Sequence, residues 1–125
     1  MTSQEQLQSP LSDPDNLDVV AELKDGGVDM LLVTIAPLDE SDGTCQRLHD
    51  KLSAYLQAAV HPNFPNVYPA ARNGRVRIFV SDSHPVSDRA RQVVHDVSRE
   101  ALTRGVVVRI GGWLPNTSLE RTRGE

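Results

Sequence analysis

The segment 41–80 constrains the fold of this chain more than any other part of the sequence. Apolar side chains recur at three- and four-residue spacing over 41–60, which predicts an amphipathic helix. A Pro-rich stretch with Tyr68-Pro69 follows, and 75–80 then alternates strictly. One face of that strand would carry Val76, Ile78 and Val80, and the other Arg75, Arg77 and Phe79. The alternation predicts a strand with a buried and an exposed side in an α+β domain.

Two strands are expected before this helix. Residues 17–24 alternate, with Leu17, Val19, Ala21 and Leu23 expected to face inward and Asp18, Val20, Glu22 and Lys24 outward. Asp25-Gly26-Gly27 predicts a tight hairpin. The next strand is expected over 28–36, and its run 30–33 is apolar on both faces, as in a central strand.

A second helix and a last strand complete the pattern. Asp39 or Ser41 is expected to cap the first helix and Ser83 or Ser87 the second, which Gly105 ends. The last strand is expected over 106–110, and 63–74 is expected to be a loop. The order is strand, strand, helix, strand, helix, strand. Right-handed crossovers then predict a two-layer α/β sandwich with a four-stranded mixed sheet and both helices on one face.

The chain of 125 residues is long enough for one domain with a hydrophobic core. Polar residues 1–16 are expected to form a disordered N-terminal arm, 17–115 a single α/β domain, and 116–125 a flexible C-terminal tail. The single cysteine, Cys45, excludes an internal disulfide and fits a reducing compartment. The first residues lack the basic and apolar regions of a signal peptide, and no apolar run is long enough to cross a bilayer. A cytoplasmic protein without a membrane partner is therefore expected.

Several of these residues match a known pattern in order and spacing: Leu31-Leu32-Val33, Ser41-Asp42, Leu48, Lys51-Leu52-Ser53-Ala54-Tyr55-Leu56, Tyr68-Pro69, Val76-Arg77-Ile78 and His84. In these the chain resembles an uncharacterised bacterial family of small single-domain proteins that carries only a domain-of-unknown-function label. The resemblance covers about residues 17–110. Members often have an aromatic residue in the loop where this chain has Leu38-Asp39-Glu40. Because this chain departs from the family pattern there, the loop is not expected to be a binding site common to the family. The resemblance implies a bacterial, cytoplasmic protein and brings no activity or catalytic residues.

The arginine-bearing strand face is the first candidate site. Arg75, Arg77 and Phe79 share it, and Arg109 of the last strand is expected to point the same way. Arginine and aromatic residues are enriched in protein interfaces, so the sequence predicts a protein-binding module with a protein partner or a second copy. The alternatives are a solvated face with Asp18 and Glu22 opposite the arginines, or a face covered by Trp113. Nucleic acid is disfavoured, because the net charge is −4 and one aromatic lies on this face.

The turn Ser81-Asp82-Ser83-His84 is the second candidate site. It follows a strand and precedes a helix, where open α/β sheets bind ligands, and this favours a small-molecule or anion-binding enzyme using Ser81, Ser83 and His84. Such a site would need a concave pocket and a further polar group from 63–74. The alternative is a capped turn. No catalytic residue is assigned.

A metal site is not expected. Cys45 and His49 are four residues apart, yet Cys45 falls on the apolar stripe of the first helix, and no second ligand pair has zinc-like spacing. Arg47, Asp50 and Lys51 fall outside that stripe. No cofactor motif is present, because Gly111-Gly112 lacks the lysine and spacing of a phosphate-binding loop.

Overall fold

The computed structural model describes residues 18–113. The predicted arm 1–16 and tail 116–125 lie outside the described residues. Four strands form one sheet in the order β1-β2-β3-β4. They are β1 (Val19–Glu22), β2 (Val28–Leu32), β3 (Val76–Val80) and β4 (Val106–Ile110). β1 runs antiparallel to β2, whereas β2, β3 and β4 are parallel, which confirms the predicted mixed sheet.

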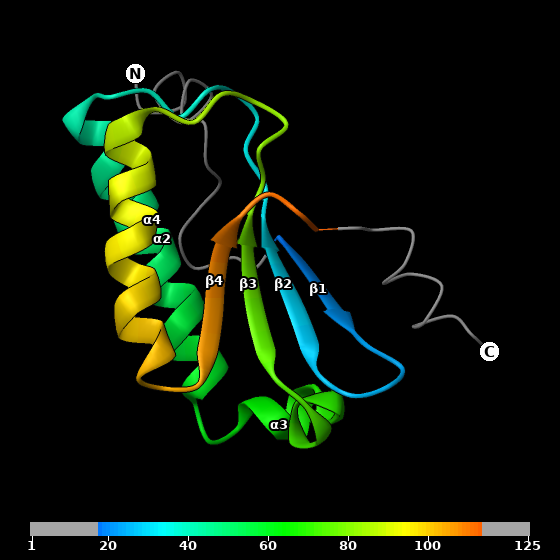
Figure 1. Cartoon of the computed structure of the whole chain (residues 1–125). Helices are drawn as coiled ribbons and strands as arrows, with labels where there is room; N and C mark the ends of the chain where they lie inside the picture. The colour runs from blue at the N-terminus through cyan, green and yellow to red at the C-terminus, as the bar shows by residue number, and fades with distance from the viewer. Residues whose placement is uncertain (1–17, 114–125) are drawn as a thin grey trace, which may run out of the picture.

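Two long helices form the second layer. α2 (Asp42–Val60) connects β2 to β3, and α4 (Asp88–Leu102) connects β3 to β4. Figure 1 shows them side by side on the same face of the sheet, as predicted. Each begins at a serine whose side chain accepts a hydrogen bond from the backbone three residues on: Ser41 from Thr44 N, and Ser87 from Ala90 N. These two serines, and not the alternatives, are therefore the N-caps.

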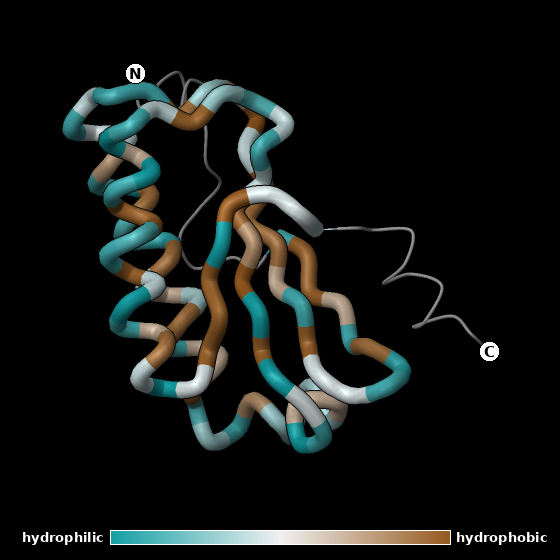
Figure 2. Tube along the Cα trace, viewed as in Figure 1, coloured by the Kyte–Doolittle hydropathy of each residue, from teal (hydrophilic) through white to brown (hydrophobic). Residues whose placement is uncertain are grey.

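The hydrophobic core lies between the helices and the sheet. Met30 and Leu32 of β2 are fully buried there with Ile78 and Val80 of β3 and the apolar stripe of α2. Figure 2 shows hydrophobic residues concentrated along the strands and alternating with hydrophilic ones along α2 and α4. No helix within residues 18–113 is long and apolar enough to cross a membrane.

Two predicted boundaries are wrong. β2 ends at Leu32 and not at Ala36, because the N–H of Val33 donates to the Asp18 carboxylate at 2.9 Å. The stretch 63–74, predicted as a loop, contains the short helices α3 (Phe64–Val67) and η1 (Pro69–Asn73). Phe64 is buried and its ring centroid lies 4.9 Å from that of Tyr68, which folds this stretch onto itself.

The predicted orientation of β1 is also wrong. Val19 pairs with Leu31 and Ala21 with Asp29, so these side chains lie on the face of the sheet opposite the helices, called the outer face below. Asp18 and Glu22 instead have partners on the helix side. Asp18 binds Lys51 of α2, and Glu22 accepts a hydrogen bond from the Ala70 N–H in η1 at 3.0 Å. The two acids are therefore not opposite the arginines of β3.

Candidate functional site

The outer face of the sheet holds a bidentate ion pair at its centre. Asp29 of β2 and Arg77 of β3 are register partners. Arg77 Nε donates to Asp29 Oδ1 and Arg77 Nη2 to Asp29 Oδ2, both at 2.8 Å. The Asp29 side chain is only 1% exposed, whereas that of Arg77 is 37% exposed. Such a forked pair fixes the plane of the guanidinium while leaving part of it accessible.

Phe79 lies next to this pair on the same face. Its ring centroid is 5.2 Å from Arg77 Cζ and 6.0 Å from Arg109 Cζ, distances at which cations bind aromatic faces. Phe79 is only 2% exposed. The strand register confirms that Arg77, Phe79 and Arg109 share one face. The Phe79 ring is buried, however, and the guanidinium groups of Arg77 and Arg109 both contact it.

Two further arginines, Arg109 and Arg75, belong to the outer face. Arg109 is exposed in β4, and Arg75 is exposed just before β3 begins. Within the four described strands, Asp29 is the acidic residue on the outer face, and it is already paired with Arg77. The accessible charge of this face is therefore positive, beside the half-buried apolar side chains of Leu31 and Val107.

The sequence pattern did not reveal Asp29 as a functional residue, because the strand around it is mostly apolar. The available signal was an acid inside a strand predicted to be central. A buried carboxylate needs a hydrogen-bonded cation, and the nearest arginine-rich strand supplies it. Parallel pairing of 28–32 with 76–80 places Asp29 beside Arg77.

The second candidate turn lines a concave surface at the carboxyl ends of the parallel strands. A pocket of about 190 Å³, called the strand-end pocket below, is lined by Leu31, Val80, Ser81, Asp82, Gly111, Gly112 and Trp113. Figure 1 shows the chain after β4 crossing the ends of β3 and β2 there. Trp113 thus lies beside Leu31, the outward residue of β2, at the end of the outer face.

The pocket differs from the predicted ligand site in two respects. The expected contribution from 63–74 is wrong, because α3 and η1 lie at the opposite end of the sheet (Figure 1). Residues after β4 take that place. Ser83 and His84 do not line the pocket, although the Ser83 hydroxyl lies 2.9 Å from that of Ser81.

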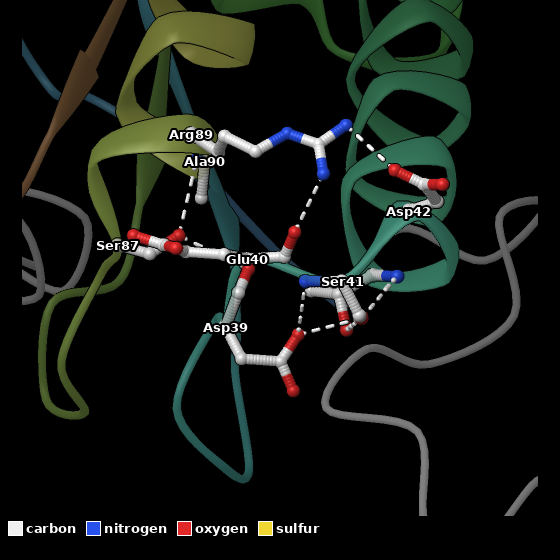
Figure 3. A network of polar contacts seen from close by, with 8 residues as sticks. Asp39, Glu40, Ser41, Asp42, Ser87, Arg89 and Ala90 are labelled. Carbon is white, nitrogen blue, oxygen red and sulfur yellow. Dashed lines mark hydrogen bonds and ion pairs between the residues drawn. The ribbon is translucent and has the colours of Figure 1, made fainter.

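The loops that precede α2 and α4 are hydrogen-bonded to each other. Leu38 N donates to Pro85 O, and Ser87 N donates to Leu38 O, each at 2.9 Å. Figure 3 shows the polar contacts around this bridge: Ser87 Oγ donates to Asp39 O at 3.0 Å, and Arg89 Nη1 to Glu40 O at 2.7 Å.

The acidic residues of these loops serve the helix starts. Arg89 Nη2 lies 2.8 Å from Asp42 Oδ1, which joins the first turns of α2 and α4. Hydrogen bonds from the Ser41 side chain and backbone lower the pKa of Asp39. These contacts are those of capped turns, so the loops position the helices and carry no separate site.

A buried polar cluster that the sequence did not reveal lies under β1. Lys51 was expected outside the apolar stripe of α2, yet its side chain is 0% exposed, with Nζ 3.1 Å from Asp18 Oδ1. Tyr55 Oη accepts from Asp18 N at 2.8 Å and donates to Leu31 O at 3.3 Å. Burial raises the pKa of the Tyr55 hydroxyl. This cluster attaches β1 to α2 and so holds the edge of the sheet in place.

The described residues offer no metal centre. No group of three or more His, Cys, Asp or Glu side chains within 18–113 is arranged to hold a metal ion. Cys45 is a free, buried thiol on the core side of α2, whereas His49 is exposed.

Comparisons with family models, curated proteins and solved structures found no match for this chain. The resemblance to an uncharacterised bacterial family therefore stays a prediction. The case for a function depends on the geometry of the outer face and of the strand-end pocket.

Proposed function

We propose that this protein is an interaction module that binds an acidic surface of another protein through its outer sheet face. The observation that carries the proposal is the pair of guanidiniums, from Arg77 and Arg109, held around the buried ring of Phe79. Arg75 adds a third exposed positive charge at the start of β3. These residues would contact carboxylates of the partner.

The rigidity of Arg77 supports this role. Immobilising a long side chain on binding costs about 0.5–1.5 kcal/mol. The bidentate contact with Asp29 and the contact with Phe79 already fix Arg77 in the free protein. Less conformational entropy is therefore lost on binding, and the remaining N–H groups of Nη1 and Nη2, which Asp29 does not use, stay available for a carboxylate of the partner.

The same charges select the kind of partner. A second copy docked face to face would place these arginines opposite each other, and like charges disfavour such a dimer. Single-stranded nucleic acid would need exposed aromatic rings for base stacking, whereas Phe79 is buried. A protein with clustered carboxylates satisfies the charge without requiring a ring. We propose the bacterial cytoplasm as its location, in keeping with the free thiol of Cys45.

Charge reversal at Arg109 is the cleanest test, because this residue is exposed and its guanidinium pairs with no buried acid in the described structure. The wild type, Arg109→Glu and Arg91→Glu would each be immobilised and used for capture from the lysate of the source organism. Arg91 is an exposed arginine of α4 in the helix layer and provides the same charge change on the other side of the molecule.

A captured protein counts only if, once purified, it binds the wild type and Arg91→Glu in calorimetry, with an affinity that falls as salt rises. Arg109→Glu should weaken that binding at least about tenfold. Equal binding by Arg109→Glu, or greater loss in Arg91→Glu, would refute the proposed surface.

A further inference from the structure

The chain enters the edge strand β1 close to the arginines of the outer face. Val19, the first residue of β1, begins a cross-strand row that ends at Arg109 of β4. Neighbouring strands are about 4.8 Å apart, so the backbones of Val19 and Arg109 are about 14 Å apart. Arg77 lies in the adjoining row, two strands from β1, and its backbone is about 12 Å from that of Val19. Both guanidinium groups are accessible, since Arg109 is exposed and the Arg77 side chain is 37% exposed.

The residue before β1 is fixed to the domain. Asp18 N donates to Tyr55 Oη at 2.8 Å, and Asp18 Oδ1 lies 3.1 Å from Lys51 Nζ. Asp18 Oδ2 accepts the Val33 N–H at 2.9 Å. Residues 1–17, called the N-terminal segment below, are therefore joined to the domain at a fixed point beside the outer face.

The acidic residues of the N-terminal segment are close enough in sequence to reach the arginines. An extended chain spans at most about 3.3–3.6 Å per residue. Asp15 precedes Val19 by four residues and can lie up to about 14 Å from it, and Asp13 can lie up to about 21 Å from it. These spans match the distances to Arg77 and Arg109, so both carboxylates can reach the guanidinium groups.

Charge distinguishes this segment from residues 114–125, which follow the described domain. The N-terminal segment contains Glu5, Asp13 and Asp15 and no lysine, arginine or histidine. Residues 114–125 contain two acidic residues and two arginines. The accessible charge of the outer face is positive, because its acid Asp29 is paired with Arg77. The N-terminal segment is therefore the one of the two whose charge complements the outer face.

We infer that the N-terminal segment lies across the outer face of its own domain, with Asp13 and Asp15 against the guanidinium groups of Arg77 and Arg109. This inference rests on the proposed function, because it uses the same arginines, and it adds regulation of that surface. Exposed ion pairs are individually weak, but a short tether gives an effective concentration in about the millimolar range. The segment thus occupies the face for part of the time, and an acidic partner must displace it.

A spin label on the full-length chain tests the contact without any partner. The label would be attached at Ser12→Cys in a Cys45→Ala background, because Cys45 is the one native cysteine. It should broaden the backbone N–H signals of Arg77 and Arg109 more than that of Gln92, which is exposed on α4 in the helix layer. Broadening at Gln92 equal to that at the arginines, or broadening that disappears on dilution, overturns the inference.

The variant Asp13→Asn with Asp15→Asn is the control for this measurement, because it removes both charges and leaves the length of the tether unchanged. Broadening at Arg77 and Arg109 should fall in this variant and also at raised salt. Broadening that is the same with and without the two charges overturns the inference.

Competition with an acetylated octaglutamate peptide tests the regulation in chains that keep Cys45. Asp13→Asn with Asp15→Asn should bind this peptide about twofold or more tighter than a variant with Asp50→Asn and Asp96→Asn. That second variant loses the same charge from exposed positions of α2 and α4. Equal affinities of the two variants overturn the inference, even where Arg109→Glu abolishes peptide binding and so supports the proposed function. Contact of the label with the outer face, together with peptide binding that Arg109→Glu leaves unchanged, supports the inference and refutes the proposed function.

Discussion

Removing Asp18 from its buried ion pair with Lys51 is expected to lower the free energy of unfolding more than removing Lys51. Lys51 Nζ is 3.1 Å from both carboxylate oxygens of Asp18, and the Lys51 side chain is 0% exposed. The Asp18 side chain is 12% exposed, and its Oδ2 also accepts the Val33 N–H at 2.9 Å. The carboxylate therefore keeps a donor and some solvent if the lysine is lost, whereas the ammonium group is shielded from solvent if the aspartate is lost.

The size of the effect follows from this difference. Asp18→Asn removes the carboxylate that lies 3.1 Å from a fully buried ammonium group, which lowers the free energy of unfolding by about 3–5 kcal/mol. Lys51→Met keeps most of the aliphatic volume and leaves Asp18 with its remaining donor, so about 1–3 kcal/mol is expected. The double variant should be no less stable than Lys51→Met alone. The two substitutions then show a coupling energy of about 3 kcal/mol or more, the cost of Asp18→Asn alone.

Urea unfolding at neutral pH, followed by far-ultraviolet circular dichroism, gives the four free energies of this cycle. The matched control is the cycle Arg89→Met with Asp42→Asn, an ion pair of 2.8 Å whose side chains are 56% and 91% exposed. That control should couple far more weakly than the buried pair, because exposed ion pairs contribute little to stability. The argument from burial would be refuted if Asp18→Asn and Lys51→Met lowered the free energy of unfolding equally and the double variant lost the sum of the two.

Three further outcomes are expected. Burial raises the pKa of Tyr55 above its unfolded-state value of about 10, so its stabilising contribution is complete below that pH and is lost as the pH rises above it. Tyr55→Phe should therefore flatten the decline in the free energy of unfolding at alkaline pH. An unchanged decline would contradict this. Thr34 is buried, and its Oγ1 has no hydrogen-bond partner among the described residues, so Thr34→Val should raise the free energy of unfolding by about 1 kcal/mol. A lower free energy in urea unfolding would show that Oγ1 has a partner. Arg77→Ser removes the bidentate contact to the buried Asp29 carboxylate and should cost about 3 kcal/mol or more, whereas Arg109→Ser should cost less than about 1 kcal/mol. Equal melting temperatures of the two variants would contradict this difference.

The order and layering of the elements could be predicted because they depend on local patterns. The strict alternation of 75–80 fixes which side of β3 faces the helices, and the serines at 41 and 87 mark both helix starts. In β1 the local pattern misled: positions 17, 19, 21 and 23 are all apolar and three of the four residues between and after them are charged, yet the apolar set of the strand lies on the outer face. Its orientation depends instead on partners that are remote in sequence.

The details of the candidate sites depend on such remote contacts. Lys51 looks like a surface residue of α2 until Asp18, 33 residues earlier, is placed beside it. Phe79 alternates with buried residues and was expected on the exposed side, but the guanidiniums of two strands enclose its ring. The strand-end pocket joins residues 31, 80–82 and 111–113, and no spacing in the sequence reveals that these segments meet.

The fork between Asp29 and Arg77 has a consequence for how this sequence can evolve. A chain that lost the arginine would keep a carboxylate that is 1% exposed, and a chain that lost the acid would free the guanidinium from its place over Phe79. Because losing either residue alone is unfavourable, positions 29 and 77 should be conserved together or substituted together among descendants of a common ancestor. Arg109 has no such constraint, and changes there can alter the choice of binding partner while the domain stays intact.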